Sequence, residues 1–438
     1  MRRDRCWPLL GQFPSFHTDT TGFLLRIAQE QGDVARFRLG RTDAVLLSHP
    51  DHVRQVLVDR AADFTKGRLM QRARRLLGDG LLTSEGDMHR AQRRRIQPVF
   101  TRERLQGYAA LVPKLVALQT AGWRDGTVIR VDAEMESLAM KMVVRALLGT
   151  DIQEQVPALS RALRRLALWA PLLATPGGRI LENIRLPMLG RLRDAIEMVE
   201  DIIGRQIDEG RTEGSLLGAL LPSDEGAPIT AHLVRDEVMT IFLAGHDTTS
   251  AALTWIWLLL GHHPEATRRL QAELASVLGG RDPMVADLER LPYTHSVVKE
   301  TLRLYPPIGR IGRRPIRDLD LDPPALRKDN AVFLSPFVTG RDPRWFSEPE
   351  AFRPARWNEA APHRPRFAWF PFGAGPRSCI GEHFATMVLT LAVATLAQRW
   401  RLRPLTPELP RVRSLLTLKP RGAVRMIVEA AARLESPA

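Results

Sequence analysis

The sequence predicts a mainly α-helical protein with a minor β region, folded as one domain. Hydrophobic residues recur with helical periodicity from about residue 50 to 310. Segments with strand character lie on either side, at residues 34–47 and 412–429. The length of 438 residues alone would suggest about three domains, but no linker, repeat or low-complexity tract divides the chain. We therefore expect a single domain over residues 1–438, with a flexible start up to about residue 15.

A β-hairpin is the first predicted element. Residues 34–39 and 44–47 are rich in branched and apolar side chains and surround Gly40-Arg41-Thr42-Asp43, a typical turn sequence. Helices follow this hairpin. Breaks in the helical periodicity are expected near residues 78–80, 176–178 and 221–226.

A long helix is predicted in the middle of the chain and strands near its end. The helix should run from about Thr230 to Gly261, since Pro264 marks its end. Residues 311–378 are proline-rich, and we expect irregular structure there. Residues 412–429 are expected to form closing strands.

The chain is strongly basic. Its 63 Lys and Arg exceed its 49 Asp and Glu, which gives a formal net charge of +14. Such a balance favours an acidic partner, nucleic acid or an anionic membrane, although a generally basic, solvated surface explains it equally well. A nucleic-acid binder would also need a basic motif with interleaved aromatic residues, whereas only 6% of this chain is aromatic. We expect no nucleic-acid partner.

Cysteine usage and hydropathy indicate a cytoplasmic protein. Cys6 and Cys379 are the only cysteines, too few for a disulfide framework or a zinc site. The N-terminus lacks the apolar core of a signal peptide, and no stretch approaches the roughly 20 apolar residues of a membrane-spanning helix. We expect a monomer without a membrane anchor.

The segment from Phe372 to Gly381 is the most informative motif and reads F-x-x-G-x-R-x-C-x-G. Cys379 lies in a glycine-rich turn just before a predicted helix, where backbone N–H groups can stabilise a thiolate. Glycines such as Gly375 let the backbone approach a flat partner closely. This presentation suits the axial ligand of a haem iron, with Arg377 placed to meet a haem propionate. An ordinary buried cysteine is the alternative.

A second motif, Ala244-Gly245-His246-Asp247-Thr248-Thr249, lies within the long predicted helix. A threonine in mid-helix can donate to a carbonyl one turn back and loosen the helix. Asp247 and Thr248 would then offer a carboxylate and a hydroxyl at a local opening. An amphipathic helix with a polar patch is the alternative. We do not assign His246 to a site, because one histidine is a poor metal site.

A third motif is Glu300-Thr301-Leu302-Arg303, in a helix that Pro306 and Pro307 should end. Glu300 and Arg303 share one helix face because residues at i and i+3 are neighbours on a helix surface. An exposed helix pair is the simpler alternative.

The three motifs together resemble the cytochrome P-450 monooxygenases, in the order that this family has them. The resemblance spans nearly the whole chain and matches the soluble, bacterial-type members. It implies a mainly helical single-domain fold, with haem b (iron protoporphyrin IX) between the long central helix and the cysteine loop. It makes Cys379 the iron ligand, with Phe372 and Gly375 in the haem-binding loop, and makes Asp247 and Thr248 the catalytic pair.

The resemblance also implies roles for several charged residues. Arg356 would join Glu300 and Arg303 in a buried structural cluster behind the cysteine loop. Arg313 resembles a family arginine that meets a haem propionate, with Arg314 as the competitor if the register differs by one. His89 and Arg93 resemble a second haem-binding pair, on a helix opened by the capping-box-like residues 84–87.

The implied reaction is the hydroxylation or epoxidation of an apolar small molecule, using dioxygen and two electrons from NAD(P)H. No dinucleotide fingerprint or fused reductase is visible, so a separate reductase and an acidic ferredoxin or flavodoxin should supply the electrons. The donor should dock on the basic face around Cys379, where the candidate residues are Arg93, Arg94, Arg95 and the neighbours of Arg377.

The substrate is expected to be a terpenoid or similar natural product, with a fatty acid or steroid as the alternative. By resemblance, the substrate-access segments are residues 66–82, 166–188, 239–244 and 308–311. Arg68, Arg72 and Arg310 could anchor a carboxylate, although each is more often a solvated side chain. A haem-thiolate isomerase, a peroxide-driven enzyme and a non-catalytic haem sensor remain as rival interpretations.

Overall fold

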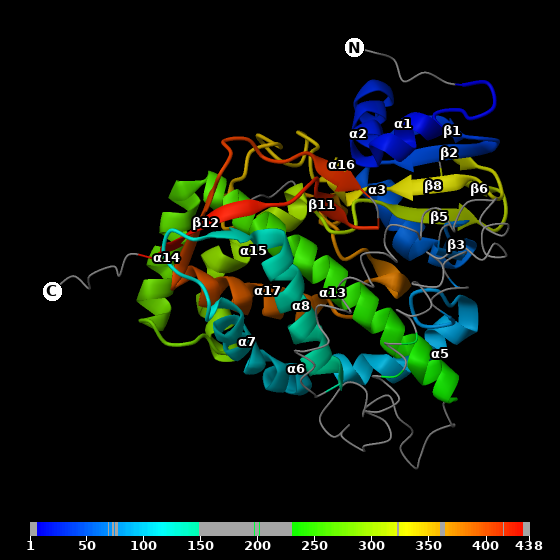
Figure 1. Ribbon diagram of the computed structural model, residues 1–438. Helices are drawn as coiled ribbons and strands as arrows, with labels where there is room; N and C mark the ends of the chain where they lie inside the picture. The colour runs from blue at the N-terminus through cyan, green and yellow to red at the C-terminus, as the bar shows by residue number, and fades with distance from the viewer. Residues whose placement is uncertain are drawn as a thin grey trace. The chain divides into compact units, whose positions relative to one another are not determined.

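The computed structural model describes the helices and strands of most of the chain (Figure 1). It describes residues 7–148 and 230–431, except 69, 72–73, 75–77, 322–323, 360–363 and 415, together with Glu197 and Asp201. The described residues form two compact units. The first comprises residues 1–71, 299–379 and 412–419, and the second comprises 72–298, 380–411 and 420–438.

A five-stranded sheet organises the first unit, in the order β1-β2-β8-β5-β3. The β1–β2 pair is the predicted hairpin and is antiparallel, whereas β8 runs parallel to β2. The strands of the sheet are β1 (Val34–Leu39), β2 (Thr42–Leu47), β3 (Phe64–Lys66), β5 (Ile311–Pro315) and β8 (Ala331–Leu334). Two small ribbons pair β6 (Leu319–Asp320) with β7 (Ala325–Leu326), and β10 (Val412–Ser414) with β11 (Leu418–Pro420).

The expectation of irregular structure over residues 311–378 is wrong at β5 and β8. Both strands are short, and β5 contains Gly312 and two arginines, so its sequence lacks a strand pattern. Their position in the sheet comes from pairing with β2 and β3, because strand preference depends strongly on neighbouring strands.

Helices and short helical turns surround this sheet. Side chains of the hairpin and of α2 pack into one apolar cluster, with Phe23 and Phe37 in edge contact. The helical elements of the first unit are α1 (Phe13–Thr18), α2 (Thr20–Gln31), α3 (Pro50–Arg54), η1 (Gln55–Asp59), η2 (Ala61–Asp63), α16 (Pro336–Thr339), η5 (Pro354–Trp357), η6 (Arg366–Ala368) and η7 (Gly375–Arg377).

The second unit is mainly helical, and its longest helix is α13 (Ala231–His262). Thr230 caps this helix through its side chain, which accepts from the Leu233 amide, and Pro264 follows its end. The predicted bounds of the helix are therefore confirmed within one residue. α13 lies along α8 (Val131–Leu148) (Figure 1).

The remaining elements of the second unit are α5 (Gly86–Ile96), η3 (Gln97–Phe100), α6 (Arg102–Ala109), α7 (Leu111–Thr120), α14 (Pro264–Leu278), η4 (Val285–Arg290), α17 (Glu382–Ala397), β4 (Val128–Arg130), β9 (Trp400–Pro404) and β12 (Arg425–Ala430). The helix α15 (Pro292–Leu304) begins in this unit and ends in the first. β4, β12 and β9 form a three-stranded sheet. Strands were expected in residues 412–429, but β4 and β9 were not foreseen.

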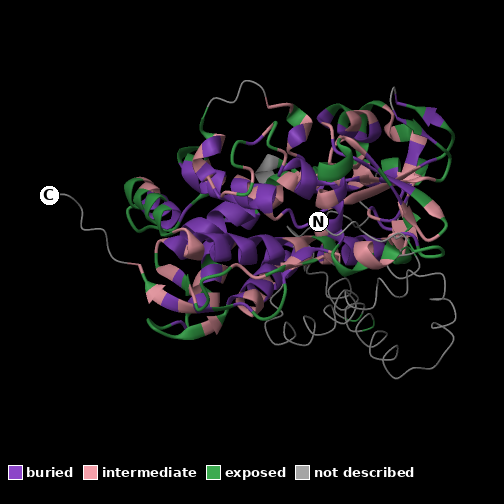
Figure 2. Ribbon diagram, turned by 90° about the horizontal axis from the view of Figure 1, so that it is seen from above, coloured by how far each residue is buried: buried purple, intermediate pink, exposed green. Residues whose placement is uncertain are grey.

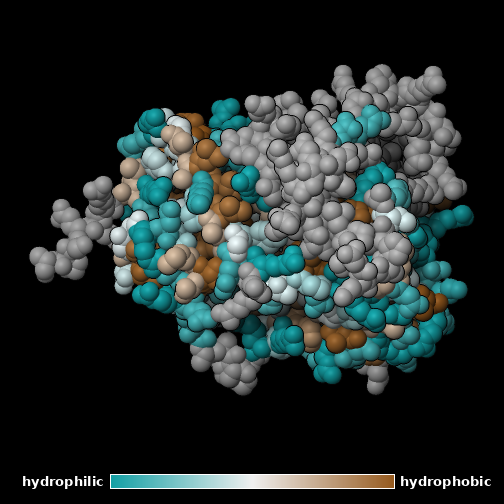
Figure 3. Space-filling view, turned by 90° about the horizontal axis from the view of Figure 1, so that it is seen from below, coloured by the Kyte–Doolittle hydropathy of each residue, from teal (hydrophilic) through white to brown (hydrophobic). Residues whose placement is uncertain are grey.

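Buried residues concentrate in the helical interior (Figure 2). Hydrophilic side chains cover most of the described surface in Figure 3, and hydrophobic ones lie among them in small groups. Among the described residues, no helix is both long and apolar enough to span a membrane. The predicted breaks at 176–178 and 221–226 lie outside the described residues.

Candidate functional site

The cysteine loop has a defined backbone conformation. The amide of Cys379 donates to the carbonyl of Phe372 at 2.8 Å, which closes the loop around η7. Gly373 and Gly375 adopt left-handed φ angles of +70° and +68°, a region that side chains disfavour. Cys379 is exposed and forms no disulfide, so its sulfur is presented at the end of this loop.

Gly375 also fits the loop against η1. A Cβ built at this position would lie 1.9 Å from the carbonyl oxygen of Leu57, closer than any real side chain allows. Sequence reasoning assigned the loop glycines to close approach by a flat partner. The structure adds that Gly375 permits the loop to pack on the backbone of η1, a contact between residues far apart in the sequence.

The centre of α13 carries two side-chain hydrogen bonds to the helix backbone. The Thr248 hydroxyl donates to the carbonyl of Ala244 at 2.7 Å, and the Ser250 hydroxyl donates to the carbonyl of Asp247 at 3.0 Å. Asp247 and Thr248 are half-buried, and Ala244 is exposed. Such bonds can loosen a helix, but α13 is continuous α-helix from Ala231 to His262, so no break accompanies them.

Residues next to Asp247 and Thr248 have structural roles. Gly245 allows α8 to approach, because a Cβ there would lie 3.1 Å from a methyl group of Val143. His246 is buried and stacks on Phe242, with 6.3 Å between ring centroids. His246 therefore packs in the interior beside Phe242.

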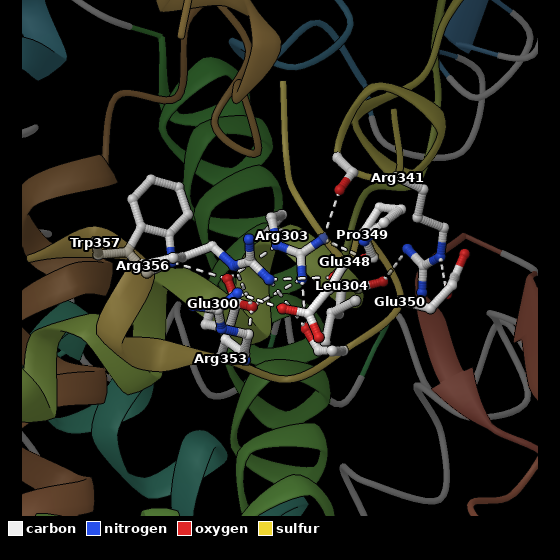
Figure 4. Close-up of polar contacts among 12 residues, drawn as sticks. Glu300, Arg303, Leu304, Arg341, Glu348, Pro349, Glu350, Arg353, Arg356 and Trp357 are labelled. Carbon is white, nitrogen blue, oxygen red and sulfur yellow. Dashed lines mark hydrogen bonds and ion pairs between the residues drawn. The ribbon is translucent and has the colours of Figure 1, made fainter. Parts of the chain in front are cut away.

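A buried ionic cluster surrounds Glu300 in the first unit (Figure 4). Arg303 donates to both carboxylate oxygens of Glu300, at 2.7 and 2.9 Å, and Arg356 donates to Oε1 at 2.9 Å. The indole N–H of Trp357 donates to Oε2 at 2.9 Å. Figure 4 shows these side chains pointing toward one another from α15 and η5. The sequence-predicted group of three residues is therefore brought together.

The guanidinium groups of this cluster also bind backbone carbonyls. Arg303 donates to the carbonyls of Gly340 and Pro349 at 2.6 and 2.5 Å, and Arg356 donates to that of Ser347 at 2.7 Å. Burial alone would raise the pKa of Glu300. The hydrogen bond from Arg303 and the charges of both arginines outweigh it and hold that pKa below its usual value.

The two arginines of β5 lie in different surroundings. Arg314 donates to Asp329 at 2.5 Å and to the side chain of Gln71 at 3.2 Å. Arg313 donates to the carbonyl of Gly312 at 3.0 Å. Since neighbouring side chains on a strand point to opposite faces, only one of the two can serve a given ligand. The structure therefore places Arg314 in an ion pair with Asp329, and the assignment of Arg313 to a propionate stays a prediction.

His89 and Arg93 lie one turn apart on α5, and His89 is buried. The predicted capping box is wrong: the N-cap is Glu85, and no side-chain hydrogen bond caps the helix. The hydroxyl of Ser84 contacts the side chain of Gln92 instead. The prediction placed the helix start too early. The helix starts at Gly86, whose φ is +56°, and the side chain of Ser84 is buried.

Sequence reasoning missed two carboxylates that anchor the segment before α5. Asp236 accepts from the amide of Asp79 at 2.8 Å, and Glu237 accepts from that of Leu81 at 2.9 Å. Gly78 and Gly80 leave room for these contacts, since a Cβ at either would clash with α13. The Gly-Asp-Gly sequence was the available signal, and it was interpreted only as a break between helices.

The expected substrate-access segments are partly described. Residues 166–188 and Arg72 lie outside the described residues. Arg68 is exposed and donates to the hydroxyl of Thr42 at 3.0 Å. Arg310 is half-buried and donates to the hydroxyl of Ser414 at 3.2 Å.

Comparison with known proteins decides the family. The model of the family described as Cytochrome P-450 matches residues 2–426, nearly the whole chain. The chain belongs to the cytochrome P-450 family. It is a cytochrome P-450 monooxygenase, and the family implies a haem cofactor.

Individual relatives agree with this assignment. The chain is 37% identical over 415 residues to cyclooctatin synthase of Streptomyces melanosporofaciens, covering 91% of this chain and 89% of that protein. It is 33% identical over 387 residues to pentalenene oxygenase of Streptomyces avermitilis, covering 84% of each. Cyanobacterial CYP120A1, solved with retinoic acid bound, superposes with a TM-score of 0.85 over 98% of each chain at 24% identity, which supports the cytochrome P-450 fold.

The residues present fit a haem. Cys379 is exposed and forms no disulfide, it lies at the end of a loop whose glycines hold left-handed conformations, and Arg377 lies two residues before it. Among the described residues, no cluster of three or more His, Cys, Asp or Glu offers a competing metal site. A thiolate is a suitable axial ligand for haem iron.

Proposed function

We propose that this monooxygenase hydroxylates or epoxidises an apolar small molecule of the terpenoid class or a similar natural product. The two relatives described above are named cyclooctatin synthase and pentalenene oxygenase. They are terpenoid oxygenases and share about 35% identity with this chain. Fatty-acid or steroid hydroxylation is the alternative. The observation that carries the proposal is the exposed Cys379 at the end of its closed glycine loop.

Within this proposal, Cys379 binds the iron, and Phe372 and Gly375 belong to the loop that presents it. Arg377, Arg313, His89 and Arg93 hold the haem propionates. A cation beside a carboxylate gains charge-assisted hydrogen bonds, which explains the choice of arginine. Glu300, Arg303 and Arg356 keep the first unit folded behind the loop and take no part in the chemistry.

Bound haem supplies the redox chemistry that activates dioxygen. The residues of α13 control protons. The Thr248 hydroxyl donates to the Ala244 carbonyl, so its oxygen lone pairs remain available to accept from a ligand. The carboxylate of Asp247 is half-buried and can hold or release a proton. We assign these two residues to proton delivery, and their presence argues against an isomerase or a peroxide-driven enzyme.

The electrons come from NAD(P)H through a separate reductase and an acidic ferredoxin or flavodoxin. The net charge of +14 and the exposed Arg94 of α5 support docking of an acidic donor. We further propose that the two units function together as a single cytochrome P-450 domain.

Carbon monoxide difference spectroscopy tests the haem assignment. The reduced holoprotein should give the absorbance band of a thiolate-ligated haem, and Cys379→Ser should lose both this band and product formation. Product analysis after incubation with terpenoids and a surrogate donor pair then tests the substrate class. A wild-type protein that lacks the thiolate band would refute the proposal. Ligand-induced spectral shifts without turnover by any donor pair would favour the non-catalytic sensor.

A further inference from the structure

Large apolar side chains are exposed close together in residues 7–13, here called the apolar turn. Leu9 is 81% exposed, and Trp7, Leu10 and Phe13 are 41–50% exposed. In the described part of the chain, these are four of the twelve exposed large hydrophobic residues, yet they fall within seven consecutive positions. Contiguous apolar surface of this kind marks a contact site for a protein or a membrane.

The apolar turn has a defined structure, so its exposure is not the fraying of a chain end. The amide of Trp7 donates to the carbonyl of Gly11 and the amide of Gly11 donates to that of Trp7, both at 2.8 Å. These bonds close a turn with Leu9 at its centre. Gly11 has a φ of +59°, and a Cβ there would lie 2.2 Å from the carbonyl oxygen of Arg38. The turn therefore packs tightly on β1.

The end of the β1–β2 hairpin holds the apolar turn in place (Figure 1). The amide of Gly40 donates to the carbonyl of Leu10 at 2.9 Å, and the amide of Gln12 donates to the carbonyl of Arg38 at 2.8 Å. The guanidinium of Arg38 donates to the carbonyl of Pro8 at 3.0 Å. A sheet thus presents these apolar side chains in a fixed arrangement, and a partner binds them with little further ordering of the chain.

Exposed arginines lie at the same end of the hairpin. Arg41 follows Gly40 in the hairpin turn, and Arg68 donates to the hydroxyl of Thr42 at 3.0 Å. Among the described residues, neither arginine has an ion-pair partner. Asp43 of the same turn is also exposed, which leaves a net positive charge on these three residues. The apolar turn therefore has a cationic border.

An anionic lipid surface fits this combination better than a protein does. Tryptophan and leucine side chains insert at the headgroup level of a bilayer, and arginines beside them attract anionic headgroups. The most exposed residue, Leu9, lies at the centre of the turn, and such an apex enters a fluid layer without needing a groove. Residues 2–5 continue the positive charge in the sequence, with three arginines and one aspartate.

A second copy of this chain is a poorer occupant of the same surface. Two apolar turns packed together would bring Arg41 and Arg68 of one chain close to the same residues of the other. Like charges facing each other across an interface are unfavourable. The charge of the border therefore favours an anionic partner over a second copy.

We propose that the apolar turn binds the surface of an anionic lipid bilayer. Trp7, Leu9 and Leu10 insert at the headgroup level, and Arg41 and Arg68 contact the anionic headgroups. This contact is peripheral and reversible, and it needs no membrane-spanning helix. It does not depend on the proposed substrate class.

Vesicle flotation tests this proposal with the haem-loaded, full-length protein. One set of vesicles contains phosphatidylcholine alone, and the other contains equal parts of phosphatidylcholine and phosphatidylglycerol. The wild type should bind the mixed vesicles at least about 10-fold more tightly than the neutral ones, because each arginine near an anionic surface contributes to binding. Binding should weaken as salt is added.

Variants of the apolar residues identify the inserted surface. Leu9→Ser with Leu10→Ser should weaken binding to the mixed vesicles by about 10-fold or more, because two apolar side chains no longer insert. The matched control is Val128→Ser with Leu405→Ser, two leucine- or valine-sized residues that are 54% and 47% exposed in the second unit. This control should bind like the wild type.

A second pair of variants tests the cationic border. Arg41→Gln should weaken binding to the mixed vesicles by about 5-fold, the usual effect of one arginine near an anionic surface. Arg425→Gln removes an exposed arginine of β12 and should bind like the wild type. Chemical unfolding and haem content check that each variant remains folded.

Three results would overturn the proposal. The first is a wild type that does not bind the mixed vesicles, and the second is binding that survives in the Leu9 and Leu10 double variant. The third is a wild-type dimer, measured by light scattering without lipid, that this double variant abolishes, because the occupant would then be a second copy. Since flotation requires no turnover, absence of the thiolate–haem band would count against the proposed function and not against lipid binding.

Discussion

Glu300 on α15 accepts a hydrogen bond from Arg356 at 2.9 Å, although 56 residues separate the two in sequence. Both side chains are almost fully buried, with exposed fractions of 0% and 3%. This contact joins α15 to η5, which precedes the cysteine loop in the sequence. Because the carboxylate is shared with Arg303 and Trp357, its removal affects several elements at once.

We expect Glu300→Gln to destabilise the fold by about 3–5 kcal/mol, because two buried guanidinium groups lose their counter-charge. Chemical unfolding of the purified holoprotein measures this change. Haem content, from the carbon monoxide difference spectrum, should fall in parallel.

Glu265→Gln is the matched control for this variant. Glu265 also pairs with an arginine three residues later, Arg268, but the two side chains are 84% and 60% exposed. An exposed pair contributes about 0–1 kcal/mol, so this control should unfold close to wild type. Equal losses of unfolding free energy in the two variants would show that burial does not increase the contribution of the Glu300 cluster to stability.

The lowered pKa of Glu300 predicts a particular dependence of stability on pH. A carboxylate whose pKa is lower in the folded state adds stability above its unfolded value, here 4.5, and loses it as the pH falls through the folded value. The difference in Tm between wild type and Glu300→Gln should therefore be constant above about pH 4.5. It should narrow at lower pH. A difference that stays constant down to the acid limit of folding would contradict the assignment.

Gly373 and Gly375 allow a test of the cysteine loop. Gly373→Ala places a side chain at a left-handed φ but meets nothing closer than 3.7 Å, and should cost about 1–2 kcal/mol. Gly375→Ala adds a collision with the Leu57 carbonyl at 1.9 Å and should cost distinctly more, with loss of bound haem. Thermal unfolding and haem content measure both variants. Similar losses in the two would mean that the contact with η1 does not constrain the loop.

Sequence reasoning succeeded where local signals were strong. The bounds of α13 follow from its apolar length, the Thr230 cap and Pro264. The hairpin follows from strand residues on both sides of a turn. The pairing of Glu300 with Arg303 follows from helical spacing alone. The inclusion of Arg356 came instead from resemblance to the family, because no local pattern connects two distant segments.

Features set by long-range contacts escaped sequence reasoning. β5 and β8 were missed because short strands in a proline-rich region take their conformation from their neighbours in the sheet. The contact of Gly375 with Leu57 and that of Arg310 with Ser414 depend on the tertiary fold. Ser84 fits a capping pattern in the sequence. Its hydroxyl contacts the buried side chain of Gln92 instead of the N-terminus of α5.

Substitution of Thr248 and of Thr254 distinguishes an effect on proton delivery from an effect on the helix backbone. Each hydroxyl donates to a carbonyl one turn back at 2.7 Å, but Thr248 is half-buried and Thr254 is buried. Thr248→Val should lower the product formed per NAD(P)H oxidised by about 100-fold or more, the usual contribution of a positioned proton-transfer group. Thr254→Val should leave this ratio close to wild type. The haem spectrum should be unchanged in both, and a similar loss in the two would assign the effect to the helix backbone.

Docking of an acidic electron donor should depend on ionic strength, since salt screens charges that are exposed on both partners. Stopped-flow reduction by an acidic ferredoxin should slow by roughly 10-fold or more between low and near-molar salt. Arg94→Glu reverses an exposed charge on α5 and should slow reduction further at low salt, whereas Arg425→Glu, exposed on β12, is the control of equal charge change. At high salt the three proteins should converge, because the long-range attraction is screened. A reduction rate that does not change with salt would rule out electrostatic docking. Equal slowing of reduction by the two variants would show that the donor does not dock on α5.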